Sequence, residues 1–159
     1  MTSPSEKRRR QRLPVLVAEE ELEVRTFVQL VRTLTRLEHR LEQSLQEHGL
    51  SLPQFDVLAT LDQSEGLSQQ ELAERLLVTK GNICGMIDRL AASDLVERRA
   101  DPQDRRTNRL FLTKTGRALL VKAFPQQHVA LKEIMNGFSA NELQTLYHML
   151  DRLEEAIGD

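Results

Sequence analysis

The stretch from residue 68 to residue 116 leaves few possible folds for this chain. It reads SQQELAERLLVTKGNICGMIDRLAASDLVERRADPQDRRTNRLFLTKTG. Two short amphipathic helices are predicted to meet at Val78 and Thr79, because the apolar period of each breaks there. Beyond them, Leu110 and Leu112 occupy alternate positions, as in a strand, and a polar loop precedes that strand. Helix, turn, helix and basic hairpin in this order place one helix and one loop on nucleic acid.

Helix starts can be located from capping residues. The capping box, in which two side chains satisfy free backbone amides reciprocally, occurs three times. The boxes are Ser51–Gln54, Ser68–Glu71 and Ser139–Glu142. Thr79 and Thr113 are placed to cap two further helices. The expected order is one long helix, three helices, a two-stranded ribbon and two more helices, which is a mainly α fold class.

The two terminal helices carry long apolar stripes. From Glu19 to His48, and again from Leu143 to Ile157, apolar residues recur at gaps of three and four. The first helix would be roughly 45 Å long, longer than a small domain is wide. We therefore expect both stripes to pack against a second copy of the chain; packing within one subunit is the alternative. The residues predicted for this interface are Leu30, Leu34, Leu146, Leu150 and Leu153.

The helix predicted over residues 80–92 has two contrasting faces. The face that must be buried carries Ile83, Met86, Ile87 and Leu90. The opposite face carries Gly81, Gly85, Asp88 and Ala92. Two glycines in a helix cost about 1 kcal/mol each relative to alanine. A bare face of this kind suits a large partner that approaches the backbone closely, and the major groove of DNA is wide enough to admit one helix.

Several residues around this helix are candidate DNA contacts. Free amides at the helix start favour a phosphate, Asn82 could bond an adenine edge, and Gln69 could bond a phosphate oxygen from the preceding helix. The alternative is that Thr79 and Asn82 serve only as capping residues. The full set of predicted contacts is Gln69, Thr79, Lys80, Gly81, Asn82, Gly85, Arg89, Arg105 and Arg106.

Positive charge gathers on the predicted hairpin. Residues 98–109 hold five arginines and two aspartates, on a chain whose formal net charge is −2. A loop-borne pair such as Arg105 and Arg106 suits a narrow minor groove, where the potential is most negative. One aspartate is expected to pair with an arginine and hold the loop in shape. The alternative is a solvated charged hairpin.

Composition excludes several other classes of protein. No run of 18 apolar residues is present, so no membrane span is expected, and the polar, basic start is unlike a signal peptide. We expect a cytoplasmic protein. A single cysteine, Cys84, excludes an internal disulfide and a thiolate zinc cluster, and no cofactor is expected. Aromatic residues make up only 4%, which disfavours a stacking platform for single-stranded nucleic acid.

The chain resembles the multiple-antibiotic-resistance regulator (MarR) family of winged-helix transcription factors over roughly residues 24–157. The resemblance is sharpest in LSQQELAERLLVTKGNICGMIDRL and LVERRADPQDRRTNRLFLTKTGRALL, where D-P-x-D-R-R precedes a strand and L-T-x-x-G. It implies an obligate homodimer, pseudo-palindromic double-stranded operator DNA, and repression relieved by a small ligand or an oxidant. Arg105 and Arg106 then fall at the wing, and residues 79–82 and 85 in the recognition helix.

The resemblance also suggests a domain plan. We predict a disordered basic tail over residues 1–18, a winged helix-turn-helix over 51–112, and a helical dimerisation region over 19–50 and 113–159. The tail is either solvated or an arm that adds phosphate contacts. Family ligand pockets lie where the dimerisation helices meet the winged-helix lobe, which makes His39, Phe55 and His128 candidates for inducer contacts by approximate position.

Cys84 lies within the predicted recognition helix, where the family commonly has serine or another small polar residue. Peroxide-sensing members use a cysteine in the first helix, and this chain has none there. We expect a partly buried, inert thiol. A redox switch, in which oxidation adds bulk near DNA, is the alternative.

Two rival functions remain from the sequence. An enzyme is disfavoured because the chain has no H-E-x-x-H, glycine-rich phosphate loop or nucleophile elbow, and its four histidines lie far apart. A winged helix that docks proteins, with the dimer as a scaffold, is compatible with the near-neutral net charge. Salt dependence of binding separates that scaffold from a DNA-binding protein.

Overall fold

The computed structural model describes residues 21–104 and 107–158. The chain divides into two compact units, residues 1–39 and 40–159. The first unit holds most of helix α1 (Leu22–Leu45), whose last residues belong to the second. Within the described ranges, no helix combines the length and apolarity that crossing a membrane requires.

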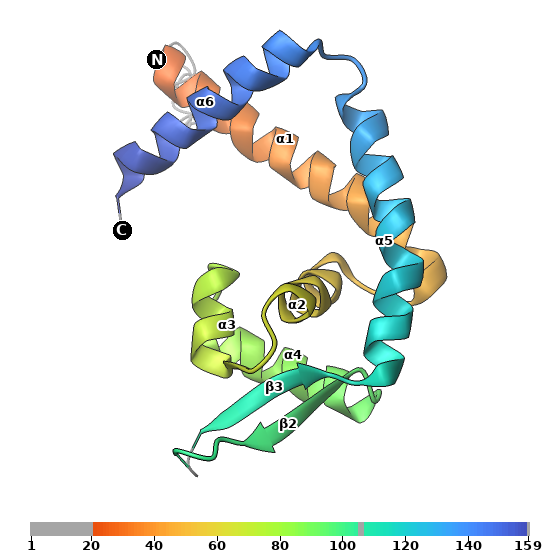
Figure 1. Ribbon diagram of the computed structural model, residues 1–159. Coiled ribbons are helices and arrows are strands. Elements are labelled where there is room, and N and C mark those ends of the chain that lie inside the picture. The colour runs from red at the N-terminus through yellow and green to blue at the C-terminus, as the bar shows by residue number, and fades with distance from the viewer. Residues whose placement is uncertain (1–20, 105–106, 159) are drawn as a thin grey trace, which may run out of the picture. The chain divides into compact units, whose positions relative to one another are not determined.

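The second unit contains the remaining helices and a small sheet (Figure 1). A short 3-10 helix, η4 (Gln46–His48), follows α1 and ends at Gly49, whose left-handed backbone turns the chain. The later helices are α2 (Leu52–Gln63), α3 (Gln69–Arg75), α4 (Lys80–Ala92), α5 (Lys114–Met135) and α6 (Ala140–Ile157). The strands are β1 (Leu67–Ser68), β2 (Val96–Ala100) and β3 (Asn108–Leu112).

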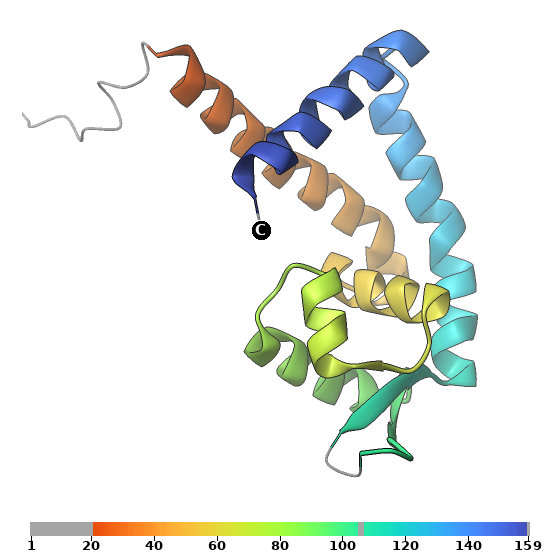
Figure 2. The ribbon, with the colours of Figure 1, turned by 60° about the vertical axis from the view of Figure 1, so that its left-hand side comes forward.

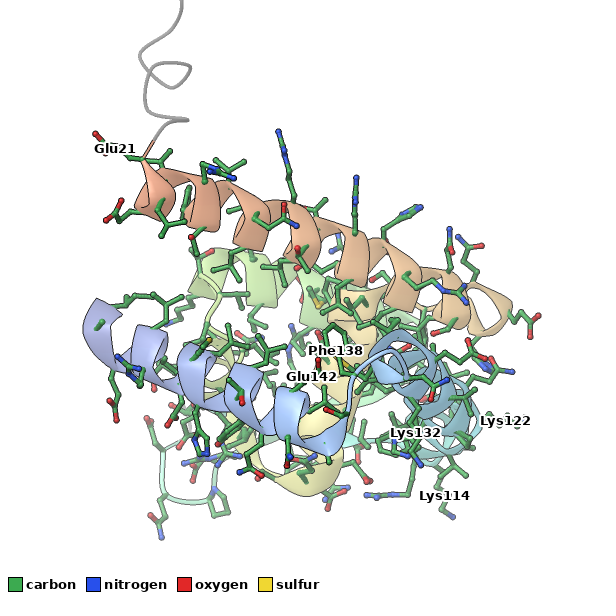
Figure 3. The ribbon with its side chains drawn as sticks, turned by 90° about the horizontal axis from the view of Figure 1, so that it is seen from above. Glu21, Lys114, Lys122, Lys132, Phe138 and Glu142 are labelled. Atoms are coloured by element: carbon green, nitrogen blue, oxygen red, sulfur yellow. The ribbon has the colours of Figure 1, made fainter. Side chains whose placement is uncertain are left out.

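Local capping explains where the helices begin. All three predicted capping boxes are confirmed: in each, the serine accepts the backbone amide of the residue three positions on, whose side chain accepts the serine amide. Thr79 and Thr113 are confirmed as single caps of α4 and α5. Figure 3 shows Glu142, which completes the third box, beside Phe138 at the start of α6. The same view labels Lys114, Lys122 and Lys132 along α5.

The predicted two-stranded ribbon is confirmed as β2 and β3, but the sequence did not predict a third strand, β1. β1 pairs with β3, so the sheet has three antiparallel strands in the order β1-β3-β2. Leu67 pairs with Leu110 in this register, while Val96 pairs with Leu112. β1 is two residues long and runs directly into α3, so it carries no alternating pattern that sequence reasoning could detect.

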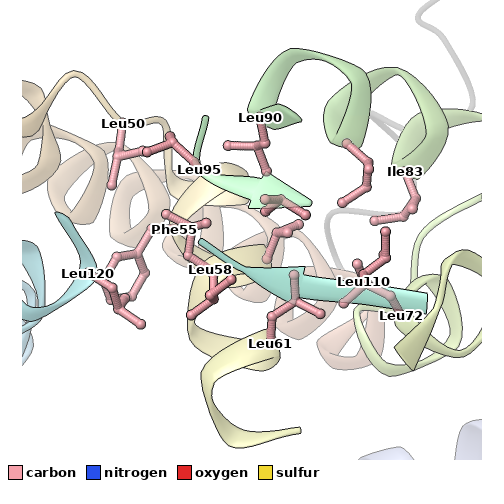
Figure 4. Packing of buried hydrophobic residues seen from close by; sticks show 14 of the residues in the cluster. Leu50, Phe55, Leu58, Leu61, Leu72, Ile83, Leu90, Leu95, Leu110 and Leu120 are labelled. Carbon is pink, nitrogen blue, oxygen red and sulfur yellow. The ribbon is translucent and has the colours of Figure 1, made fainter. Parts of the chain in front are cut away.

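The buried core joins the helices to the sheet (Figure 4). Figures 1 and 2 show α2, α3 and α4 gathered beside the strands, with α5 leading away from the end of β3. The most deeply buried large side chains are Leu45, Leu58, Leu61, Leu72, Ile83, Ile87, Leu90, Leu110, Val57 and Val96. Leu45 and Leu50, which precede α2, and Leu120 and Ala123 of α5 belong to the same cluster. This core therefore extends past both predicted ends, 51 and 112, of the winged domain.

The end of α4 is tied to the start of α5. Asp94, which has a left-handed backbone, accepts hydrogen bonds from the Thr113 hydroxyl at its carbonyl (2.5 Å) and from the Thr115 hydroxyl at its carboxylate (2.9 Å). Gly116 packs so closely here that a Cβ atom would lie 2.0 Å from the Leu95 carbonyl oxygen. The orientation of α4 is therefore linked to that of α5.

Candidate nucleic-acid interface

A tight turn separates α3 from α4. The Val78 amide donates to the Ala73 carbonyl oxygen at 3.0 Å, which closes α3. Leu77 has a positive φ of 52° and an 89% exposed side chain, so the turn itself faces solvent. Thr79 then starts α4, and its hydroxyl accepts the Asn82 amide at 3.4 Å. This is the helix-turn-helix geometry expected from the sequence.

The two predicted faces of α4 are both confirmed. Ile83, Ile87 and Leu90 are buried, and Met86 packs partly against the core. On the opposite face, Gly81, Gly85, Asp88 and Ala92 are all exposed. Among the residues that the structure describes, a Cβ atom added at Gly81 or Gly85 would meet nothing within 4 Å. No close contact with the described residues calls for glycine at these two positions, which leaves the approach of a partner as a reason for the bare surface.

The predicted DNA contacts are distributed over two neighbouring helices. Thr79 caps α4; Lys80, Gly81, Asn82, Gly85 and Arg89 are exposed on it. Gln69 is the first residue of α3 and is half-buried. Arg105 and Arg106 lie outside the described residues. The contacts themselves remain predictions; what α4 brings together is one open, polar and basic surface.

The described arginines of the hairpin form ion pairs, so their positive charge is partly neutralised by neighbouring carboxylates. Arg98 pairs with Asp88 of α4 at 2.5 Å, which ties β2 to α4. Arg99 pairs with Glu97 and lies over the Phe111 ring, 4.2 Å from its centroid. Arg109 pairs with two carboxylates. The three described arginines are therefore matched by acids, two of which, Asp88 and Glu71, come from outside the hairpin.

Arg109 lies at the base of the hairpin loop. Its Nε donates to Asp101 Oδ2 at 2.6 Å, which confirms the predicted aspartate–arginine pair. Its Nη1 donates to Glu71 Oε2 at 2.8 Å and to the Gly66 carbonyl oxygen at 3.2 Å. Sequence reasoning missed the last two partners, because 38 and 43 residues separate them from Arg109.

Hydrogen bonding keeps both carboxylates of this cluster ionised. The Ser68 amide and hydroxyl, followed by the Arg109 charge, lower the pKa of Glu71. The Gln103 amide lowers the pKa of Asp101, and the Arg109 side chain adds to that effect. The same pairing raises the pKa of Arg109. The cluster therefore stays charged throughout the neutral pH range.

The predicted dimerisation leucines are partly exposed. On α1, Leu30 is 37% and Leu34 51% exposed; on α6, Leu146, Leu150 and Leu153 lie between 40% and 45%. No residue of α6, which is described throughout, is buried. Both helices are nonetheless amphipathic, so each presents an apolar stripe that a second molecule could cover.

Two of the three candidate ligand residues lie in one aromatic row. The Phe55 and Phe124 ring centroids are 6.4 Å apart, and Phe124 is 6.4 Å from His128. Phe55 is buried, whereas Phe124 and His128 are exposed. His39 belongs to the other unit. A shallow groove of about 330 Å³ is lined by the end of α1 and by α5, and its described lining residues are Arg40, Ser44, Pro125, Gln126, Val129, Ala130 and Glu133.

Cys84 corrects one expectation. Its side chain is exposed rather than partly buried, because the residue lies at the flank between the core face and the bare face of α4. Among the described residues, no cluster of three metal-ligating side chains is present.

Comparisons with known proteins agree with this geometry. A sequence profile of the MarR family matches residues 48–107. The HTH-type transcriptional repressor YetL of Bacillus subtilis is 32% identical over 134 residues, which cover 83% of this chain and 80% of YetL.

Two solved structures extend the comparison to the fold. The transcriptional repressor CouR bound to a 23-mer DNA duplex aligns with a TM-score of 0.76 and 27% identity, covering 89% of this chain and 98% of CouR. Bordetella bronchiseptica BpsR, in a structure concerned with regulation of its DNA binding by 6-hydroxynicotinic acid, has a TM-score of 0.74 and 25% identity. That alignment covers 81% of this chain and 98% of BpsR. The expected winged helix-turn-helix fold is confirmed.

Proposed function

This chain belongs to the MarR family of winged-helix transcription regulators, and we propose that it is a homodimeric, ligand-responsive repressor of transcription. Its target is double-stranded operator DNA with pseudo-palindromic symmetry. In this proposal α4 enters the major groove and the hairpin between β2 and β3 enters the adjacent minor groove.

The bare face of α4 carries the proposal. Gly81 and Gly85 leave the helix backbone open to a partner, although two glycines weaken a helix. Lys80, Asn82 and Arg89 are exposed around it and supply charge and hydrogen bonds for phosphates and base edges. Gln69 starts α3, the helix that crosses the DNA backbone in this geometry.

The apolar stripes of α1 and α6 support the proposed homodimer interface. Leu30 and Leu34 on α1, with Leu146, Leu150 and Leu153 on α6, are exposed on amphipathic helices. Burial of these stripes against a second copy would stabilise both helices. The twofold axis of such a dimer would present two copies of α4 to successive major grooves, which matches a symmetric operator.

A small aromatic ligand is the proposed inducer. CouR is a repressor, and BpsR is a protein whose DNA binding 6-hydroxynicotinic acid regulates. In this chain, Phe124 and His128 leave aromatic surface open beside the buried Phe55. We propose that Phe55 and His128 contact the inducer. For His39, which belongs to the other unit, the support is its approximate position in the sequence. Membership of a regulator family favours a non-enzymatic role in the cytoplasm, where bacterial chromosomal DNA lies.

Selection of bound duplexes from a random DNA pool tests the function. We expect enrichment of a symmetric sequence whose half-sites lie about 10 base pairs apart. Between 50 and 200 mM salt, log affinity should fall against log salt with a slope of about −5 if six phosphates are contacted. Absence of enrichment, together with salt-insensitive binding to a protein, would favour the docking scaffold.

A further inference from the structure

We infer that Arg109 is a positioning residue that holds the β2–β3 hairpin in fixed orientation against the start of α3. The inference rests on the proposed function, because it concerns how two separate elements meet one DNA duplex. Its effect on binding comes through the guanidinium fork rather than through positive charge alone.

The position of Arg109 in the sheet suits this role. β3 is the central strand, and Arg109 pairs with Ser68 of β1 on one side and Arg99 of β2 on the other. Its side chain donates to Glu71 and to the Gly66 carbonyl in one direction and to Asp101 in the other. One guanidinium thus joins the turn before β1, the first turn of α3 and the end of β2.

Each carboxylate partner of Arg109 also holds a chain segment by itself. Glu71 accepts the Ser68 amide at 2.7 Å and so completes the cap of α3. Asp101 accepts the Gln103 amide at 2.8 Å, and the Asp101 amide donates to the Thr107 carbonyl at 2.9 Å, which joins the two ends of the loop. Rotation of the hairpin against α3 would therefore break charged hydrogen bonds at both ends of the fork.

The chemistry demands arginine. A guanidinium presents several donors in a rigid plane and can reach carboxylates on two sides at once. A lysine ammonium keeps the charge but has neither the plane nor the span. Arg99 offers a matched comparison, because it lies directly opposite Arg109 in the register yet pairs with Glu97 of its own strand.

The test compares Arg109→Lys, Arg109→Gln and Arg99→Lys in the full-length protein on a selected operator duplex. We expect both Arg109 variants to lose about tenfold in affinity, and Arg99→Lys to stay within about twofold of wild type. Hydroxyl-radical protection of the minor groove beside each recognition helix should fall in the Arg109 variants. Protection of guanine N7 from methylation in the major groove should persist, because Ile83, Ile87 and Leu90 still hold α4 in the buried core.

Wild-type affinity in Arg109→Lys would overturn the inference, since charge alone would then suffice. An equal loss of both protections would overturn it too, because α4 would have moved with the hairpin. If the Arg109 variants fail to fold, Glu71→Gln keeps an amide for the α3 cap while weakening the fork, and it should show the same selective loss of minor-groove protection. If the wild-type protein binds no duplex, the proposed function itself fails; that result is distinct from unaffected binding by Arg109→Lys.

Discussion

At the scale of single residues, the two glycines on α4 lower the stability of the helix, and no packing contact among the described residues accounts for them. Neither Gly81 nor Gly85 has a positive φ, and a Cβ atom at either position would lie more than 4 Å from every other described group. Replacing either one should therefore improve the helix. Gly116 is the opposite case, because the Leu95 carbonyl occupies the space that its side chain would need. The proposed DNA partner would explain the first two glycines, whereas packing within the chain explains the third.

This contrast gives a prediction for Gly85. Gly85→Ala and Gly85→Leu should each raise the free energy of unfolding, by up to about 1 kcal/mol, because both residues favour a helix more than glycine does. DNA affinity should fall with the size of the new side chain, which fills the groove-facing surface. The loss should be slight for alanine and at least about tenfold for leucine. Fluorescence anisotropy with an operator duplex and urea unfolding measure the two effects. A leucine variant that binds normally would mean that this face of α4 points away from DNA.

At the scale of elements, the hairpin and α3 share one electrostatic support. Glu71 and Asp101 have pKa values below their ordinary 4.5 and 3.8, since both carboxylates accept backbone amides and face Arg109. A carboxylate with a lowered folded-state pKa contributes stability that is fully present above its unfolded value. That contribution is lost as the pH falls through the folded value.

Acid unfolding of charge-neutral variants tests this support. At pH 7, the Glu71→Gln and Asp101→Asn variants should each unfold at a lower urea concentration than the wild-type protein. The difference should shrink as the pH is lowered from about 5 to below 3, where the wild-type carboxylates also become protonated. Glu155→Gln, an exposed position on α6, is the control and should follow wild type throughout. A deficit that stays constant down to the lowest pH would show that the carboxylate charges contribute nothing.

At the scale of the whole molecule, burial is unevenly distributed. The core gathers α2, α3, α4, the sheet and the start of α5, whereas α6 buries no residue although it has a strongly apolar side. Exposed large apolar side chains such as Phe27, Tyr147 and Met149 lie on α1 and α6.

Leu150→Asp should therefore dissociate the dimer. A charge within a buried apolar interface is strongly unfavourable, so the variant is expected to sediment as a monomer at concentrations where wild type is dimeric. Thr145→Asp on the polar side of α6 is the control and should remain dimeric. Analytical ultracentrifugation measures both. A dimeric Leu150→Asp would show that this stripe does not form the interface.

The amino-acid order alone was enough to predict those features that depend on neighbours within about one helical turn. Each capping box joins residues three positions apart, and the two faces of α4 follow from a period of 3.6 residues. The family motif around the hairpin is equally local. Chain folding had to decide which distant groups meet: β1 against β3, Asp88 with Arg98, and Glu71 with Arg109. No short-range pattern encodes these pairs, because the topology of the sheet, rather than spacing along the chain, sets the distance between them.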